Sequence, residues 1–220
     1  VEPGELIDIL SWAMENPSDT VLVEADSAPV LENKMEQTDI SVLPIPRHYR
    51  EDGGRYQSSS IIVAQYGKQR NTSFHRQLLK GPDRTTVRLV PRHLRTMADQ
   101  AFENNEDVPI VVVNGPDPLV LLAAAMSFNE PIDELRVASA LHERLYGAKL
   151  GLVEMPNGVQ VPAESEYAME ARITTKLDDE GPYVDITGTV DDIRQEQVIE
   201  YDSIYHLSLI HISEPTRPSQ

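Results

Sequence analysis

The sequence predicts an α+β fold in which several strands form the core and a few helices cover it. Between residues 58 and 90, short strand-forming segments alternate with turn residues. Val108–Val113 is mostly β-branched, which is typical of a buried strand. Apolar residues between Gly4 and Glu15 recur with helical spacing.

The elements can be assigned in chain order from the same patterns. After the helix at residues 4–15, residues 20–24 predict a short strand and residues 25–57 are polar and irregular. Further strands are expected at residues 60–66, 73–79, 85–90, 108–113, 150–154, 167–176, 183–189 and 197–205. Further helices are expected at residues 94–104, 119–126 and 132–146, the last with acids in its first turn.

Composition narrows the classes of partner. The 220 residues include 19 Lys plus Arg and 36 Asp plus Glu, a formal net charge of -17, which disfavours nucleic acid and anionic membranes. Cysteine is absent, so disulfides and thiolate chemistry are excluded, and no apolar run is long enough to span a bilayer. We therefore expect a cytoplasmic protein. Basic residues concentrate between Arg47 and Arg95, which suggests an anionic ligand or simply solvated strands.

Three residues offer ligands for a hard divalent cation. The carbonyl of Asn71, the imidazole of His93 and the carboxylate of Glu134 together suit Mn²⁺ or Mg²⁺. Spacing alone does not select them, because they come from different elements. A turn role for Asn71, at the start of its strand, and a surface role for His93 remain open.

A second candidate cluster is Glu180-Gly181-Pro182-Tyr183-Val184-Asp185. Gly and Pro permit a sharp bend, so the two carboxylates need not point to opposite faces as in a regular strand. Alternatively, both acids continue an acidic surface stretch that begins at Asp178.

The order of these motifs resembles the UbiD family of decarboxylases, which use prenylated FMN. The resemblance covers nearly all of residues 35–206, and its order is more specific than any one motif. The matching segments are Leu43–His48, Asp52–Tyr56, Asn71–Arg76, Arg88–His93, Gly115–Pro118, Ile132–Glu134, Val161–Ala163 with Glu166 and Glu170, Glu180–Asp185 and Asp202–His206.

The resemblance implies an FMN-binding split β-barrel with flanking helices at residues 58–206. Residues 1–57 would be part of an α/β N-terminal region that leads into it. Residues 207–220 include a segment that resembles a translated sequencing adapter, so we expect a read-through tail and a missing C-terminal domain.

The resemblance also implies site roles. Asn71, His93 and Glu134 would bind Mn²⁺ or Mg²⁺ at the flavin phosphate, with K⁺ as a further candidate cation. The implied cofactor-binding residues are Phe74, His75, Arg76, Arg88, Leu89, Val90, Arg92, His93 and Leu94. Arg76 would pair with Glu180, and Asp185 would donate a proton, for which its pKa should be raised by burial or by the charge of Glu180.

The implied activity is non-oxidative removal of CO₂ from an unsaturated or aromatic carboxylic acid. Candidate substrates are trans-anhydromevalonate 5-phosphate and a polyprenyl-4-hydroxybenzoate. A flavin prenyltransferase would supply the cofactor, and the full-length protein would form homo-oligomers. Val184 and His75 depart from the glycine and tyrosine common in the family. The alternatives are an FMN-binding split-barrel oxidoreductase and a non-catalytic flavin-binding homologue.

Overall fold

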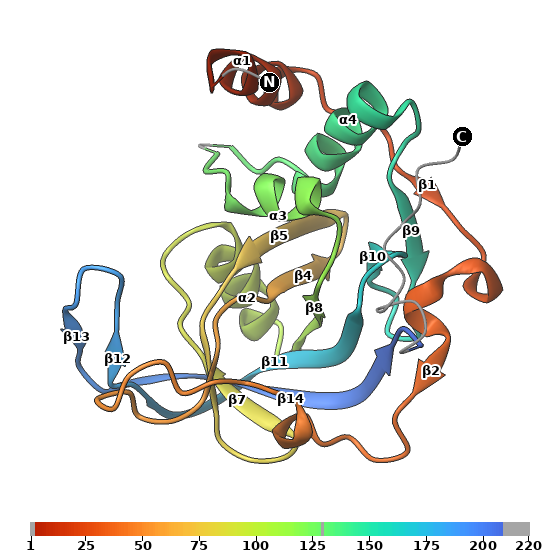
Figure 1. The fold of residues 1–220 in the computed structure, drawn as a ribbon. Coiled ribbons are helices and arrows are strands. Elements are labelled where there is room, and N and C mark those ends of the chain that lie inside the picture. The colour runs from red at the N-terminus through yellow and green to blue at the C-terminus, as the bar shows by residue number, and fades with distance from the viewer. Residues whose placement is uncertain (1–2, 129, 209–220) are drawn as a thin grey trace.

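A computed structural model describes residues 3–128 and 130–208 of the chain (Figure 1). It confirms a mixed α+β architecture built mostly from antiparallel sheets. Within these ranges, no helix combines the length and the apolar character needed to cross a lipid bilayer. The adapter-like segment lies outside the described residues from residue 209 onward.

The core is a nine-stranded sheet with the order β3-β6-β7-β14-β11-β8-β4-β5, and β2 pairs with β14. Its pairings are antiparallel throughout. The strands are β2 (Asn33–Lys34), β3 (Tyr56–Gln57), β4 (Ile61–Tyr66), β5 (Gln69–Phe74), β6 (Gln77–Leu79), β7 (Arg84–Val87), β8 (Val108–Asn114), β11 (Tyr167–Glu180) and β14 (Arg194–His206).

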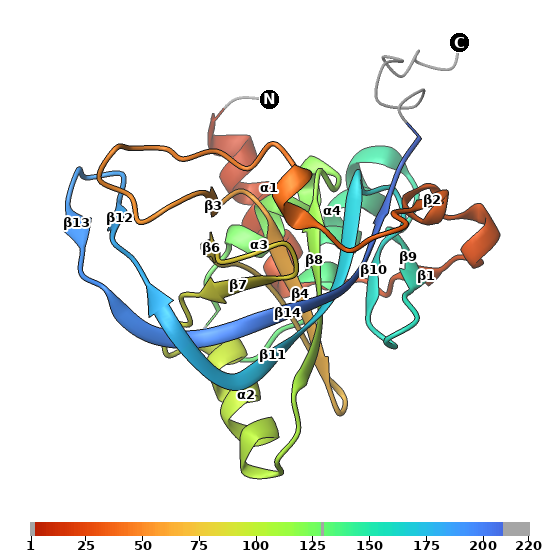
Figure 2. The same cartoon turned by 90° about the horizontal axis from the view of Figure 1, so that it is seen from below.

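The sheet curls, and its two ends are joined by short connections rather than by hydrogen bonds. Figure 2 shows the long strands β11 and β14 curving together beneath the smaller strands. β3 passes directly into β4 through residues 58–60, and β5 passes into β6 through residues 75–76. The terminal strands β3 and β5 do not pair with each other, so the described strands do not close into a barrel.

Two hydrophobic cores lie on opposite faces of the sheet, as the alternation of β8 requires. Val111 and Val113 enter one core, while Ile110 and Val112 enter the other. Both faces of this strand are buried, which explains its nearly uninterrupted β-branched sequence.

Helices cover both faces of the sheet. α1 (Pro3–Glu15), α3 (Pro118–Ala125) and α4 (Glu134–Tyr146) contribute to the first core. A small sheet of β1 (Val21–Leu22), β9 (Gly151–Glu154) and β10 (Gln160–Pro162) packs beside them. α2 (His93–Glu103) covers the second core. Three single-turn helices, η1 (Ala25–Ser27), η2 (Pro29–Leu31) and η3 (Ile40–Val42), shape the irregular lead-in.

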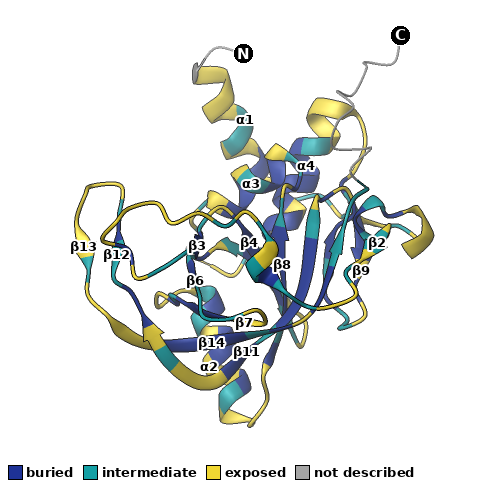
Figure 3. Cartoon of the chain, turned by 60° about the horizontal axis from the view of Figure 1, so that its bottom comes forward, coloured by how far each residue is buried: buried dark blue, intermediate teal, exposed yellow. Residues whose placement is uncertain are grey.

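The structure shows that two of the strand predictions are wrong. The segment 73–79 is divided, because β5 ends at Phe74 and β6 begins only at Gln77, on the opposite end of the sheet. The segment 183–189 is a hairpin of β12 (Tyr183–Val184) and β13 (Val190–Asp191). This hairpin is mostly exposed and stands apart from the body of the sheet (Figure 3).

Candidate active site

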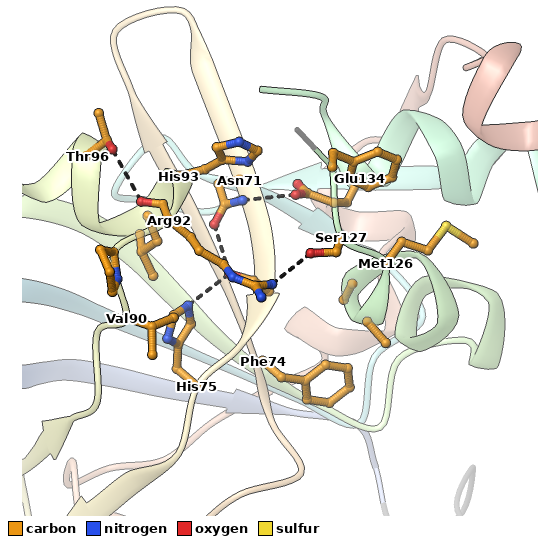
Figure 4. Close-up of a pocket in the computed structure, with 16 residues that line it drawn as sticks. Asn71, Phe74, His75, Val90, Arg92, His93, Thr96, Met126, Ser127 and Glu134 are labelled. Carbon is orange, nitrogen blue, oxygen red and sulfur yellow. Dashed lines mark hydrogen bonds between the residues drawn. The ribbon is translucent and has the colours of Figure 1, made fainter. Parts of the chain in front are cut away.

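A cavity of about 750 Å³ opens between β5 and the ends of three helices (Figure 4). Its wall combines polar groups of β5 with the start of α2, the end of α3 and the start of α4. The lining residues include Asn71, Ser73, Phe74, His75, Val90, Arg92, His93, Leu94, Ser127 and Glu134. This volume is typical of a small-molecule or cofactor site.

The edge strand β5 meets α4 through the carboxylate of Glu134. β5 is the last strand of the sheet, so its outward backbone N–H groups have no partner strand. The Thr72 N–H donates to Glu134 Oε2 at 2.7 Å, and the Asn71 amide donates to Glu134 Oε1 at 2.9 Å. Asn71 therefore lies within the strand and faces the cavity, which corrects its expected position at the strand's start.

Glu134 is a buried carboxylate without an ion-pair partner among the described residues. Its residue is 3% exposed, and burial raises the pKa of its carboxyl to about 7, although the Thr72 N–H acts to lower it. Among the described residues, the side chain of Glu134 accepts from Asn71 and Thr72 and forms no ion pair with a Lys, Arg or His. A divalent cation beside Asn71, His93 and Glu134 would supply the missing charge, so these residues fit the metal that the sequence predicts.

His75 and Ser73 affect which atoms of Asn71 remain free. The Ser73 hydroxyl lies 2.8 Å from Asn71 Oδ1 and 3.0 Å from His75 Nε2, and His75 Nδ1 lies 3.1 Å from the Arg88 carbonyl. Burial lowers the pKa of His75, which favours the neutral ring. The Ser73 hydroxyl donates to Asn71 Oδ1. Because an amide oxygen has two lone pairs, Asn71 Oδ1 can accept this bond and still bind a cation.

The start of α2 faces the same cavity and suits an anion. Arg92 occupies the N-cap position, and no side chain caps the helix. The Arg92 guanidinium donates at 2.8 Å to the hydroxyl of Ser127, which follows the end of α3. Uncapped N–H groups and a guanidinium together form a favourable environment for a phosphate.

The second cluster centres on the ion pair between Arg76 and Glu180. Arg76 Nε donates to Glu180 Oε1 at 2.9 Å and Arg76 Nη2 to Glu180 Oε2 at 3.0 Å, a bidentate pair. Glu180 is fully buried. Arg76 Nη1 also donates to Asp191 at 2.7 Å. Burial lowers the pKa of Arg76, but the bonds to Glu180 and Asp191 outweigh this and leave it raised.

Aromatic rings and the lead-in segment hold this cluster. The Arg76 guanidinium lies 4.4 Å from the centroid of the Tyr183 ring, and the Tyr56 hydroxyl lies 3.2 Å from Glu180 Oε1. Gly53 packs so closely that a Cβ there would lie 2.3 Å from the Gly181 carbonyl oxygen. The buried Asp52 accepts from the Val184 N–H at 2.9 Å. The lead-in therefore fixes the bend after Glu180.

Asp185 does not join Arg76 and Glu180 directly. Its Oδ1 accepts from Thr187 N and Thr187 Oγ1 at 2.8 and 2.6 Å, and from Thr189 N at 3.1 Å, all within the hairpin turn. The Thr187 hydroxyl and these backbone groups hold the pKa of Asp185 below its usual range. The expected rise of this pKa is therefore wrong in this conformation, because the carboxylate is neither buried nor paired with Glu180.

The structure brings most of the predicted cofactor residues to the cavity and separates three of them. Arg76 belongs to the second cluster, Arg88 forms an ion pair with Glu196, and Leu89 is buried in the second core. Sequence reasoning missed Tyr56 and Asp191. Both lie close to Arg76 only through long-range pairing, so no local pattern could indicate them.

A comparison with protein families matches residues 21–210 to the family described as UbiD, 3-octaprenyl-4-hydroxybenzoate carboxy-lyase Rift-related domain. This match covers well over half of the chain. The chain belongs to the UbiD family.

Several curated relatives are named decarboxylases. Anhydromevalonate phosphate decarboxylase of Methanothermobacter thermautotrophicus is 39% identical over 209 residues, which cover 90% of this chain and 47% of that protein. Phenolic acid decarboxylase of Bacillus subtilis is 28% identical over 195 residues, which cover 82% of this chain and 40% of that protein. The chain spans about half the length of the curated relatives it matches.

Solved structures with a similar fold include a UbiD-class enzyme. HmfF of Pelotomaculum thermopropionicum, a UbiD-class enzyme in complex with prFMN, gives a TM-score of 0.86 at 33% identity over 91% of this chain and 47% of that one. Vanillic acid decarboxylase of Sedimentibacter hydroxybenzoicus gives a TM-score of 0.87 at 23% identity over 94% of this chain and 46% of that one, which supports the fold alone.

Proposed function

We propose that this chain is the cofactor-binding part of a non-oxidative decarboxylase that uses prenylated FMN and a divalent metal. The single observation that carries the proposal is the buried carboxylate of Glu134, which has no ion-pair partner among the described residues and lies beside Asn71 in a cavity of cofactor size. Decarboxylase names among the curated relatives and a prFMN complex among the solved structures support the same reading.

Asn71, His93 and Glu134 would hold Mn²⁺ or Mg²⁺, with K⁺ as a further candidate in the same cradle. The cation and the uncapped start of α2 would together bind the flavin phosphate. Phe74 and Val90 line the cavity although each is 38% exposed, so they offer apolar contact to a flat ring system.

The remaining predicted cofactor residues would act from behind the cavity wall. The Arg88 carbonyl accepts a hydrogen bond from the His75 ring, and Leu89 is buried in the second core. His75, Arg92 and Leu94 line the cavity itself. A split barrel with FMN at its mouth is our proposal for the core, because short connections join the two ends of the curled sheet.

The reaction breaks the bond between a substrate carbon and its carboxylate. CO₂ leaves, the electron pair stays on carbon, and that carbon then takes a proton. Prenylated FMN, when bound, supplies the site that accepts these electrons. Arg76, held by Glu180, would orient the substrate carboxylate, and Asp185 would donate the proton. Asp185 must first leave the turn bonds to Thr187 and Thr189.

Anhydromevalonate phosphate is our first candidate substrate, because five curated relatives carry that decarboxylase name at 37–39% identity. A polyprenyl-4-hydroxybenzoate is the second. A flavin prenyltransferase would supply the cofactor, the whole protein would act in the cytoplasm, and copies of it would form homo-oligomers. No observation favours an FMN oxidoreductase or a non-catalytic binding role.

The test is to express the full-length gene with a flavin prenyltransferase and to determine the mass and spectrum of the bound cofactor. Prenylated FMN with bound Mn²⁺ is the expected result, followed by CO₂ release from one of the two candidate acids. Unmodified FMN, or a protein without flavin, would refute the proposal. The cofactor measurement does not depend on knowing the substrate.

A further inference from the structure

An ion pair lies directly behind the proposed metal ligands. Arg70 Nη2 donates to Asp133 Oδ2 at 2.6 Å, and Arg70 Nε lies 3.1 Å from both Asp133 oxygens. Arg70 Nη1 donates to Gln160 of β10 at 3.1 Å. The side chains of Arg70 and Asp133 are 12% and 23% exposed, so water screens this pair only partly.

The pair joins the two backbones that carry metal ligands. Arg70 immediately precedes Asn71 on β5, and Asp133 immediately precedes Glu134 at the start of α4. Asp133 also caps α4, because its Oδ1 accepts from the Leu135 N–H at 3.1 Å. Successive residues of β5 thus contact successive residues of α4, and the amide and carboxylate of the proposed site have little freedom to separate.

We propose that Arg70 and Asp133 are positioning residues that set the separation of Asn71 and Glu134 and thereby the affinity for the divalent cation. This inference rests on the proposed metal site. The planar guanidinium of Arg70 suits this role, because a bidentate contact with Asp133 fixes direction as well as distance. Groups that orient metal ligands from behind commonly change metal affinity by about 10–100-fold when they are replaced.

Electrostatics and positioning predict opposite results for one substitution. Replacing Arg70 removes a positive charge near the site and leaves Asp133 uncompensated, so charge alone would strengthen cation binding. Loss of positioning would weaken it. Arg70→Gln therefore separates the two accounts by whether cation affinity rises or falls. Arg70→Lys keeps the charge but loses the bidentate contact.

The capping role of Asp133 can also be separated. Asparagine caps helices about as well as aspartate, so Asp133→Asn keeps the start of α4 but removes the ion pair. The same helix offers a matched control in Arg136, which pairs with Asp19 at 2.9 Å on the surface. The side chains of that pair are 47% and 77% exposed, and Arg136→Gln should leave the metal site unchanged.

The experiment titrates Mn²⁺ into the protein with FMN present and measures free Mn²⁺ by electron paramagnetic resonance. We expect Arg70→Gln and Asp133→Asn each to weaken Mn²⁺ binding about tenfold, with Arg70→Lys between them and the unmodified protein. The double variant should be weakened less than the product of the single effects, because both changes remove one contact. Glu134→Gln should lose the site, and Arg136→Gln should stay within about twofold.

Two other outcomes would contradict the proposal, one the positioning role alone and one the metal site as well. Unchanged or tighter Mn²⁺ binding by Arg70→Gln, with binding lost in Glu134→Gln, would overturn the positioning role and leave the metal site standing. Equal binding by the unmodified protein and Glu134→Gln would overturn the metal site and the positioning role together. Circular dichroism of each variant checks that α4 still forms, and Arg70→Lys serves if Arg70→Gln fails to fold.

Discussion

Glu134 and Glu180 are both buried carboxylates, but their surroundings differ in charge. Glu180 has a bidentate Arg76, whereas backbone and amide N–H groups alone hold Glu134. A buried charge without a counter-ion is costly, while a paired one is costly mainly when its partner is removed. Glu180 therefore has its counter-ion within the chain, and the absence of an ion-pair partner for Glu134 among the described residues is the basis of the proposed cation site.

The largest expected effect concerns the hairpin acid rather than either buried one. Asp185→Asn keeps the shape of the side chain but cannot donate a proton. We expect CO₂ release by the full-length enzyme to fall about a thousandfold, within the range for a lost general acid, while the cofactor stays bound. Turnover on the chosen substrate and the flavin spectrum are measured together, and undiminished turnover would reject the role.

Glu180→Gln should cause the largest loss of stability. It leaves Arg76 with only Asp191 as a charged partner at the cluster. We expect the free energy of unfolding to fall by about 3 kcal/mol, as for one partner removed from a buried ion pair. Urea unfolding at neutral pH measures the change. A loss no larger than that of an exposed pair would show that Glu180 is not held as the geometry indicates.

Glu134→Gln should have the opposite sign in metal-free protein. The folded pKa of about 7 lies above the ordinary value of 4.5 for a glutamate, so folding is favoured by protonation of this group. The destabilising effect of the Glu134 carboxylate is small below pH 4.5, grows between pH 4.5 and 7, and levels off at about 3 kcal/mol above pH 7.

Urea unfolding in EDTA at pH 5 and pH 8 checks this contribution of Glu134. The variant should gain stability over the unmodified protein mainly at pH 8. A destabilised variant at pH 8 would mean that the carboxylate is satisfied without a cation.

The smallest expected effect is that of Asp191→Asn. Its carboxylate is 32% exposed and forms only one of the contacts of Arg76. Partly screened pairs contribute about 1 kcal/mol or less to stability, so the free energy of unfolding should change little. A loss as large as that of Glu180→Gln would remove the distinction between the two acids.

The sequence allowed prediction of elements whose pattern is local. The buried strand at Val108–Val113 and the helix ending at Tyr146 follow from β-branched content and helical spacing, and the structure confirms both. The break at residues 75–76 was missed, because it depends on which end of the curled sheet each half joins.

The site residues also differ in whether the sequence could predict them. The order of family motifs predicts Asn71, His93 and Glu134 as one site, and all three line one cavity. Asp191 and Tyr56 reach Arg76 through pairings of distant segments, which spacing cannot reveal. The turn that holds Asp185 was also missed, because Asp-x-Thr supports a local hydrogen bond as readily as a strand.

The central claim is that Glu134 is held ready for a divalent cation, and the thermal response to Mn²⁺ tests it most directly. A ligand that binds only the folded state raises the melting temperature as its concentration exceeds Kd. Mn²⁺ should raise the melting temperature of the unmodified protein and of Asp191→Asn by similar amounts, and should leave that of Glu134→Gln unchanged. An equal rise in Glu134→Gln, or none in the unmodified protein, would contradict the claim.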